Sequence, residues 1–207
     1  MPWAVLIPLL VLALLIAGIA WLRTHPSPLP YTQRLFVQGP HPGLGHQRLR
    51  EILEPKPGER ILEIGPGTGY HSLPVAPWIS PGGTLEIVDV IEEWLEHTSE
   101  AAKREGIANI VPTRADATSL PHEAGSFDAA FLVQVLGEVP DQVAALRELR
   151  RVLKPEGRLV VGENVLDPHV VTLRGLRHRA EAAGLRFDGA RGGTLAYFAR
   201  LRPEKAD

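Results

Sequence analysis

The feature that most constrains the fold of this chain is an apolar run that leads directly into three closely spaced glycines. Residues Ile61-Leu62-Glu63-Ile64 read as a buried strand, and Gly65, Gly67 and Gly69 follow at alternate positions before a segment with helical character. Glycine lets the backbone turn sharply and lets a ligand approach closely, because no side chain stands in the way. This strand–turn–helix pattern is typical of α/β domains with parallel strands.

Short apolar runs and amphipathic segments alternate along the rest of the chain. Strands are expected at Arg60–Ile64, Thr84–Val88, Ile110–Arg114, Phe127–Val133 and Arg158–Gly162. Helices are expected at Leu44–Leu53, His71–Trp78, Glu92–Glu105 and Asp141–Leu153. A last helix starts after Thr172 and stops at Gly184, and the strands Leu185–Asp188 and Leu195–Leu201 then form a hairpin. The pattern predicts a doubly wound, Rossmann-like, mostly parallel sheet of seven strands with a final antiparallel strand.

The first residues have a different character. Residues Trp3–Leu22 carry no charged side chain and are almost wholly apolar, and about 20 residues of helix span the roughly 30 Å of a hydrocarbon core. Trp3 and Trp21 lie at the two ends, where indole rings favour the membrane interface. We therefore expect a transmembrane helix over residues 1–22. A cleaved signal peptide, with Gly18-Ile19-Ala20 as its cleavage site, is the alternative, but the chain lacks the basic n-region and the apolar run is long.

Residues 23–42 are expected to tether this helix to the remainder of the chain. Five prolines favour an extended, semi-rigid conformation there. They are Pro26, Pro28, Pro30, Pro40 and Pro42. Because Arg23 and Arg34 follow the apolar run and no Lys or Arg precedes it, the positive-inside tendency places the body, residues 43–207, on the cytoplasmic side.

Composition excludes several classes of partner and site. The formal net charge is −2, so the chain has no excess of basic residues for gripping phosphate backbones, and we expect no nucleic-acid partner. Cysteine is absent, which excludes disulfides, thiolate metal sites and a thiol nucleophile. The sequence shows no histidine pair on a helix and no carboxylate cluster at ligand spacing, so we expect no metal.

Acidic residues follow the first three predicted strands in a meaningful order. Glu63 ends the first strand, where its carboxylate can meet an ammonium directly or through water. Asp89 ends the second, where a carboxylate can accept hydrogen bonds from both hydroxyls of a ribose. Asp116 follows the third and can accept from the exocyclic amine of adenine, while Trp94 lies close enough to pack on the purine. A helix cap, a turn and a core residue would explain Asp89, Asp116 and Trp94 separately, but their common order predicts a nucleoside site.

The chain resembles the class I S-adenosylmethionine-dependent methyltransferases, especially the small-molecule branch that methylates quinones and phospholipids. The motifs that carry the resemblance are Glu63-Ile64-Gly65-Pro66-Gly67-Thr68-Gly69, Asp89, Asp116-Ala117, Ser126-Phe127-Asp128, Val139-Pro140-Asp141 and Leu153-Lys154-Pro155-Glu156-Gly157. The resemblance implies S-adenosylmethionine as cofactor, held by Glu63, Gly65, Pro66, Gly67, Gly69, Asp89, Val90, Trp94, Asp116, Ala117 and Gln134. One departure concerns substrate handling, because many relatives carry a histidine pair where this chain has Gly137-Glu138.

The catalytic residues are less well defined than the cofactor site. Displacement at a sulfonium methyl depends mainly on alignment of the nucleophile and exclusion of water, so a dedicated base is optional. Weak candidates for proton transfer lie at strand ends, beside the glycine turn and in the lead-in segment. They are His71, Gln134, Glu138, Tyr31 and His41, with His46 and Asn164 as further possibilities.

Three functions compete at this point. The leading one is a membrane-anchored methyltransferase that acts on a small, lipid-soluble or interfacial acceptor. The second is a scaffold or sensor that binds S-adenosylmethionine at the membrane without catalysis. The third, a nicotinamide oxidoreductase, is disfavoured because Tyr70 occupies the sixth position of the glycine turn, where the dinucleotide fingerprint needs a glycine.

Overall fold

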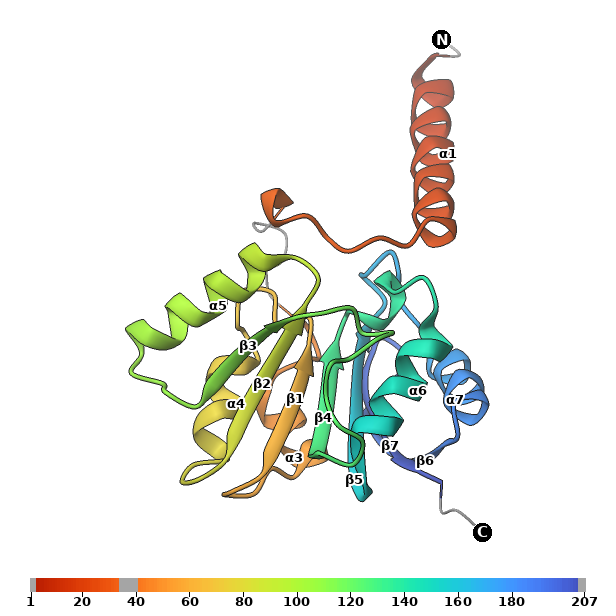
Figure 1. The fold of residues 1–207 in the computed structure, drawn as a ribbon. Helices are drawn as coiled ribbons and strands as arrows, with labels where there is room; N and C mark the ends of the chain where they lie inside the picture. Colours follow the sequence, from red (N-terminus) through yellow and green to blue (C-terminus); the bar gives the residue numbers. More distant parts are fainter. Residues whose placement is uncertain (1–2, 34–40, 205–207) are drawn as a thin grey trace.

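A seven-stranded, mostly parallel sheet forms the centre of the molecule (Figure 1). The computed structural model describes residues 3–33 and 41–204, with some side chains of the first helix left out. The strands lie in the order β3-β2-β1-β4-β5-β7-β6, and β7 runs antiparallel to both of its neighbours. Their bounds are β1 (Arg60–Ile64), β2 (Thr84–Asp89), β3 (Ile110–Arg114), β4 (Phe127–Val133), β5 (Leu153–Asn164), β6 (Leu185–Gly192) and β7 (Ala196–Pro203). The predicted Rossmann-like sheet with its final antiparallel strand is confirmed.

Helices cover both faces of this sheet. The helices are α1 (Trp3–Thr24), α3 (His46–Leu53), α4 (Ser72–Trp78), α5 (Glu92–Arg104), α6 (Gln142–Val152) and α7 (Leu173–Ala182), and short 3-10 turns are η1 (Tyr31–Gln33) and η2 (Leu136–Glu138). Neighbouring residues of one strand face opposite layers, as Ile61 packs in the cluster of α3, α4 and α5 while Leu62 packs in the cluster of α6 and α7. Strands buried on both faces explain why the sequence shows continuous apolar runs rather than strict alternation.

Capping groups set several helix ends. The side chain of Asp141 accepts a hydrogen bond from the Ala144 amide at 2.9 Å at the start of α6, and Thr172 accepts from Gly175 at 3.2 Å at the start of α7. Gly184 follows α7 with a φ of 72°, a left-handed conformation that glycine adopts without strain. Asp141 and His71 are therefore caps rather than the first helical residues that the sequence predicted.

Two strands are longer than their sequence patterns indicated. β5 begins at Leu153 rather than at Arg158. Residues 154–157, expected to separate helix from strand, instead form a bulge in β5 between the pairs Phe127–Leu153 and Ala129–Arg158. β6 continues through Gly189, which was expected to turn the chain, and the register shifts beside that residue instead. Both differences arise because pairing with a neighbouring strand outweighs local turn-forming residues.

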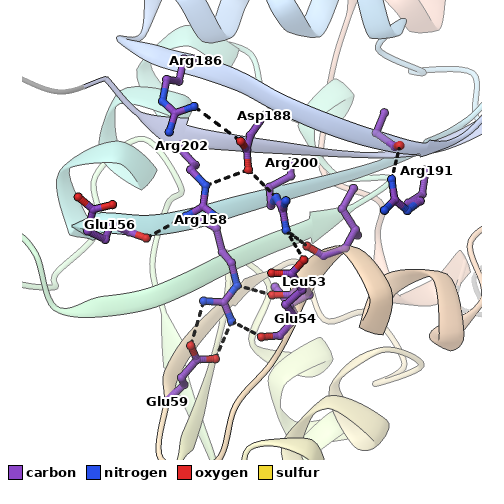
Figure 2. Close-up of polar contacts among 12 residues, drawn as sticks. Leu53, Glu54, Glu59, Glu156, Arg158, Arg186, Asp188, Arg191, Arg200 and Arg202 are labelled. Carbon is purple, nitrogen blue, oxygen red and sulfur yellow. Dashed lines mark hydrogen bonds and ion pairs between the residues drawn. The ribbon is translucent and has the colours of Figure 1, made fainter.

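A buried arginine ties the amino-terminal edge of the sheet to α3 (Figure 2). The guanidinium of Arg158 on β5 contacts both carboxylate oxygens of Glu59 at 2.9 and 2.6 Å. It also donates to the backbone carbonyls of Leu53 and Glu54 at the end of α3. The same view shows Asp188 between the arginines of β6 and β7, which closes the antiparallel side of the sheet.

The chain begins with the helix α1 (Trp3–Thr24), which stands apart from the sheet and its layers (Figure 1). Among the residues described, no helix is both long and apolar enough to cross a membrane, so the span predicted over residues 1–22 is not supported by the structure. The described apolar side chains of α1 are nevertheless exposed, with Leu10 and Leu14 at 61% and 64%. Of the predicted tether, Arg34 and Pro40 lie outside the described residues.

Candidate functional site

A cavity of about 600 Å³ opens at the carboxyl edge of the sheet. Its floor comes from the ends of β1, β2, β4 and β5, and it spans the point where the chain, after building β1-β2-β3, returns to place β4 on the other side of β1. Ligands bind at such switch points in open α/β sheets because the loops there diverge and leave a crevice. A more open hollow beside α6, near Arg150 and Glu156, lies away from this edge and contains none of the predicted site residues.

The glycine turn supplies one wall of the cavity. Gly65, Gly67 and Gly69 all adopt positive φ, at 69°, 55° and 82°. A Cβ at Gly65 would collide with the side chain of Val135 from the β4 end. Glycine is therefore required at this position both by the backbone conformation and by the close approach of the next strand.

Glu63 lies beneath this turn rather than on the cavity wall. Its side chain is 3% exposed, and one carboxylate oxygen has no hydrogen-bond partner. Burial raises the pKa of Glu63 to about 8, although Ser72 beside it offsets this in part. An unpartnered carboxyl next to the glycine turn fits the ammonium of a bound amino acid, since an opposite charge would satisfy it. Pro66 and Gly69 are buried within the turn and are likewise not among the residues that line the cavity.

Two aspartates lie on the opposite wall. Asp89 at the end of β2 accepts a hydrogen bond from the Ile91 amide at 2.9 Å, and burial raises its pKa to about 6. Asp116 follows β3, is exposed, and accepts from the amide and hydroxyl of Thr118 at 2.8 and 2.7 Å. These contacts orient each carboxylate. Val90 and Ala117, their neighbours in sequence, also line the cavity.

Trp94 and Gln134 complete the part of the wall that the sequence predicted. Trp94 is 3% exposed, and its indole N–H donates to the carbonyl of Leu29 at 3.0 Å. Gln134 follows β4 with a φ of 58°, a strained conformation for a residue with a side chain, and its backbone N–H donates to the Gly162 carbonyl at 2.8 Å. Strain at such a position is common in functional sites.

The catalytic candidates separate into two groups. His41, Gln134 and Glu138 line the cavity, as does Asn164. Tyr31 is not among the lining residues, and it packs on Trp94 and hydrogen-bonds to His97. His71 also lies off the wall, where burial lowers its pKa to about 3, and His46 contacts it and Tyr70 rather than the cavity.

Glu138, Glu163 and Asp167 form a cluster of buried carboxyl groups near η2, of which only Glu138 was predicted from the sequence. Burial raises the pKa of Glu138 to about 8, and Asp167 and Asp89 raise it further. Glu163 on β5 is 1% exposed, has one unpartnered oxygen and also has a raised pKa through burial. Asp167 lines the cavity together with His169. Asp167 and His169 follow β5, and the carboxyl ends of parallel strands meet at the ligand-binding edge of such sheets. Their position in the sequence could therefore have indicated that they belong to the site.

The residues present fit S-adenosylmethionine. The buried carboxyl of Glu63 beside the turn, the cradle at Gly65 and the oriented carboxylate of Asp89 provide for an ammonium, a close backbone approach and a ribose. Together with the order of the strands, this arrangement resembles that of class I methyltransferases, which take S-adenosylmethionine as their cofactor. Within the described residues, no group of three or more His, Asp or Glu side chains could hold a metal ion.

Comparison with known proteins agrees with this class. Residues 62–161, just under half of the chain, match the family described as "Methyltransferase domain". The chain is 36% identical over 103 residues to the demethylmenaquinone methyltransferase of Lactococcus lactis, which covers 50% of this chain and 41% of that protein. It is 30% identical over 113 residues to the nocamycin O-methyltransferase of Saccharothrix syringae, covering 55% and 40%.

Solved structures share the fold. A S-adenosylmethionine-dependent methyltransferase from Aquifex aeolicus aligns with a TM-score of 0.71 at 18% identity and covers 84% of this chain and 98% of that one. The cyclase SpnF aligns with a TM-score of 0.69 at 20% identity, covering 78% and 80%. The chain spans less than half the length of the two curated relatives described above.

Proposed function

We propose that this protein transfers the methyl group of S-adenosylmethionine to a small-molecule acceptor. The observation that carries the proposal is one continuous cavity, in which the predicted nucleoside-binding wall at Asp89 and Trp94 faces a second wall at Glu138, Asn164 and Asp167. The first wall suits the cofactor, and the second leaves room for an acceptor beside it. When bound, the cofactor would supply a sulfonium methyl group, whose carbon the acceptor attacks in line as the C–S bond breaks and S-adenosylhomocysteine leaves.

The residues of the second wall contribute positioning and exclusion of water. Val135, Val139 and Leu166 give this wall an apolar surface, which aligns the acceptor and keeps water out. His41 is the better placed group to accept a proton, because burial and the nearby His46 lower its pKa and keep it neutral at pH 7. Glu138, with a pKa of about 8, holds its own proton at pH 7 and is a poorer base.

The proposed acceptor is small and lipid-soluble, of the quinone class. Two observations support this. Relatives named as demethylmenaquinone methyltransferases share 36% and 32% identity with parts of this chain. The acceptor wall includes the apolar side chains of Val135, Val139 and Leu166, and among the described residues the cavity lining has no lysine or arginine to bind a strongly anionic substrate.

Label transfer tests this directly. Purified protein is incubated with S-adenosylmethionine labelled in the methyl group and with a membrane lipid extract or a demethylated quinone, and products are separated and counted. We expect label in the neutral lipid or quinone fraction and, at a cofactor concentration below saturation, much less label with an Asp89→Asn variant. Label in neither fraction, from protein that binds the cofactor, would contradict the proposal.

That outcome would favour the second candidate, a cofactor-binding protein without methyl transfer. One specific observation keeps this candidate in view: the structural neighbour SpnF is a cyclase, so the fold alone does not determine the reaction. Turnover of any acceptor by the protein would eliminate the candidate.

The proposal extends to attachment at a membrane through α1, with the methyltransferase domain on the cytoplasmic side. Its support is the run of exposed apolar side chains on successive positions of the helix, including Leu9, Leu10, Val11 and Leu12, which occupy all sides of it. Such a surface is unfavourable in water and differs from the one-sided apolar stripe of a helix that packs on a domain. Arg23, in the last turn of α1, and Arg34, later in the sequence, support the orientation.

A further inference from the structure

A segment between α1 and η1 crosses the cofactor cavity. Figure 1 shows the chain leaving α1 and running over the top of the domain to η1, close to α5. Pro28 and Leu29 line the cavity from this side, as does Gln33. We call residues 28–31 the strap.

The strap is fastened on both sides of the cavity. The Leu29 amide donates a hydrogen bond to Oε2 of Glu138 at 3.1 Å, on the β4 side. The Leu29 carbonyl accepts one from Nε1 of Trp94 at 3.0 Å, on the α5 side. A single strap residue therefore joins Trp94 and Glu138, which are 44 positions apart in the sequence.

Tyr31 adds a second fastening on the α5 side. Its ring meets Trp94 edge-on, with ring centres 4.9 Å apart, and its hydroxyl lies 3.0 Å from Nδ1 of His97. The strap therefore contacts Trp94 twice: the Leu29 carbonyl binds the indole nitrogen, and the Tyr31 ring packs edge-to-face with the indole. Its placement against a purine depends on where the strap lies.

We propose that Glu138 is a positioning residue that holds the strap closed and, through Leu29, fixes Trp94 against the bound cofactor. This rests on the proposed function, because it assigns Glu138 a task in binding S-adenosylmethionine. The side chain acts as a hydrogen-bond acceptor, and the reaction needs no proton from it. Its amide replacement therefore serves equally well, since the side-chain oxygen of glutamine also accepts from a backbone N–H.

The first experiment compares Glu138→Ala and Glu138→Gln. Binding of S-adenosylhomocysteine is measured by calorimetry, and its release rate is measured by dilution of the labelled compound. We expect Glu138→Ala to weaken binding about tenfold, as loss of one hydrogen bond and of the closed strap would do, with most of the change in the release rate. Glu138→Gln should restore both affinity and turnover to within about threefold of the parent.

The second experiment removes the donor instead of the acceptor. Leu29→Pro deletes the N–H while keeping the carbonyl, between two residues that are already proline. It should reproduce the loss seen with Glu138→Ala, and the double variant should bind no more weakly than either single one. Leu29→Ala keeps both backbone groups and separates the effect of the lost N–H from that of the shortened side chain. Thr32→Ala, at an exposed position next to the strap that does not line the cavity, is the control and should stay close to the parent.

Each outcome bears on the proposal. Full affinity in Glu138→Ala, additive losses in the double variant, or failure of Glu138→Gln to restore turnover would overturn it, the last by indicating a proton-transfer role. If the parent itself does not bind S-adenosylhomocysteine, the proposed function fails as well. A folded parent that binds, with an unaffected Glu138→Ala, refutes only the strap.

Discussion

Burial gives carboxyl groups of this molecule different pKa values, although their chemistry is the same. Glu63 and Asp89 both lie at the carboxyl ends of parallel strands, yet Asp89 opens onto the cavity with a pKa of about 6, whereas Glu63 is enclosed with a pKa of about 8. Burial is the larger cause in each case. At pH 7, Asp89 is largely ionised and accepts hydrogen bonds as an anion. Glu63 largely keeps its proton, and an opposite charge bound beside it would favour its ionised form.

Asp89 should carry much of the affinity for the ribose. Replacing it by Asn removes the charge but keeps the shape, so we expect cofactor affinity to fall about 10- to 100-fold, the range for hydrogen bonds to a charged group. Calorimetry with S-adenosylhomocysteine at pH 7.5 measures this. The exposed Glu93 on α5 provides a control, because Glu93→Gln changes charge by the same amount and should bind like the parent. Equal losses in both variants would contradict a ribose contact.

Glu63 should make the cofactor-free protein less stable as pH rises. The folded state holds a proton on Glu63 up to a pKa of about 8, while the unfolded chain loses it near 4.5. The stabilisation is complete below pH 4.5 and is lost as pH rises towards 8, by roughly 1 kcal/mol for each pH unit per proton. Urea unfolding between pH 5 and 8 measures this slope.

A Glu63→Gln variant tests whether the slope comes from this residue. Since glutamine does not titrate, the free energy of unfolding should fall less steeply with pH in the variant than in the parent. Glu138 contributes in the same direction and leaves a residual slope. Identical slopes in variant and parent would contradict the assignment to Glu63.

The sequence predicted which residues lie at the cofactor site better than it predicted their neighbours in space. The residues Gly65, Gly67, Asp89, Trp94 and Gln134 were all predicted at the cofactor site and all lie on the cavity wall. Their contacts with the cofactor remain predictions. Asp167 was not anticipated, because its place in the cavity depends on the loop after β5 rather than on a motif.

For the helices and strands, the sequence predicted their order and type well but their first and last residues less well. Periodicity and capping residues located each strand and helix of the sheet domain within a few residues. The bulge at residues 154–157 and the length of β6 escaped the pattern, because a strand end is decided by its neighbour's hydrogen bonds. The same applies to the tether, where η1 forms at Tyr31–Gln33 within a segment expected to be extended.

The buried Arg158 should matter for stability because it joins three elements. Replacing it by Met leaves Glu59 and two carbonyls at the end of α3 without their partner. We expect the free energy of unfolding to fall by about 3 kcal/mol. Urea unfolding measures this.

Arg186 supplies the comparison for that measurement. It is half-exposed and lies 3.6 Å from Asp188, so Arg186→Met should cost less than about 1 kcal/mol. If both variants lost the same stability, burial of the Arg158 network would not be the cause.

For the whole molecule, the relation between α1 and the sheet domain is decisive. Liposome flotation of the full chain, with and without Leu10→Lys and Leu14→Lys together, tests whether α1 holds the protein on lipid. We expect the parent to float with the vesicles and the double variant to stay at the bottom, since two charges make insertion unfavourable by several kcal/mol. Leu166→Lys, an exposed residue of the domain, is the control and should float.

Protease protection then distinguishes a crossing helix from one lying in the interface. A protease added outside sealed vesicles removes an N-terminal tag from an interfacial helix, whereas a crossing helix protects a tag in the lumen. A parent that does not float contradicts attachment through α1.

The sequence by itself determined the class of fold, the glycine turn and the order of acidic residues at the strand ends, because these depend on local periodicity and on residues close together in the chain. Only the tertiary structure decided that Leu29 lies between Glu138 and Trp94, that Val135 presses on Gly65, and that Glu63 is enclosed. The physical reason is the distance along the chain: these contacts join segments that are brought together only when the sheet is assembled.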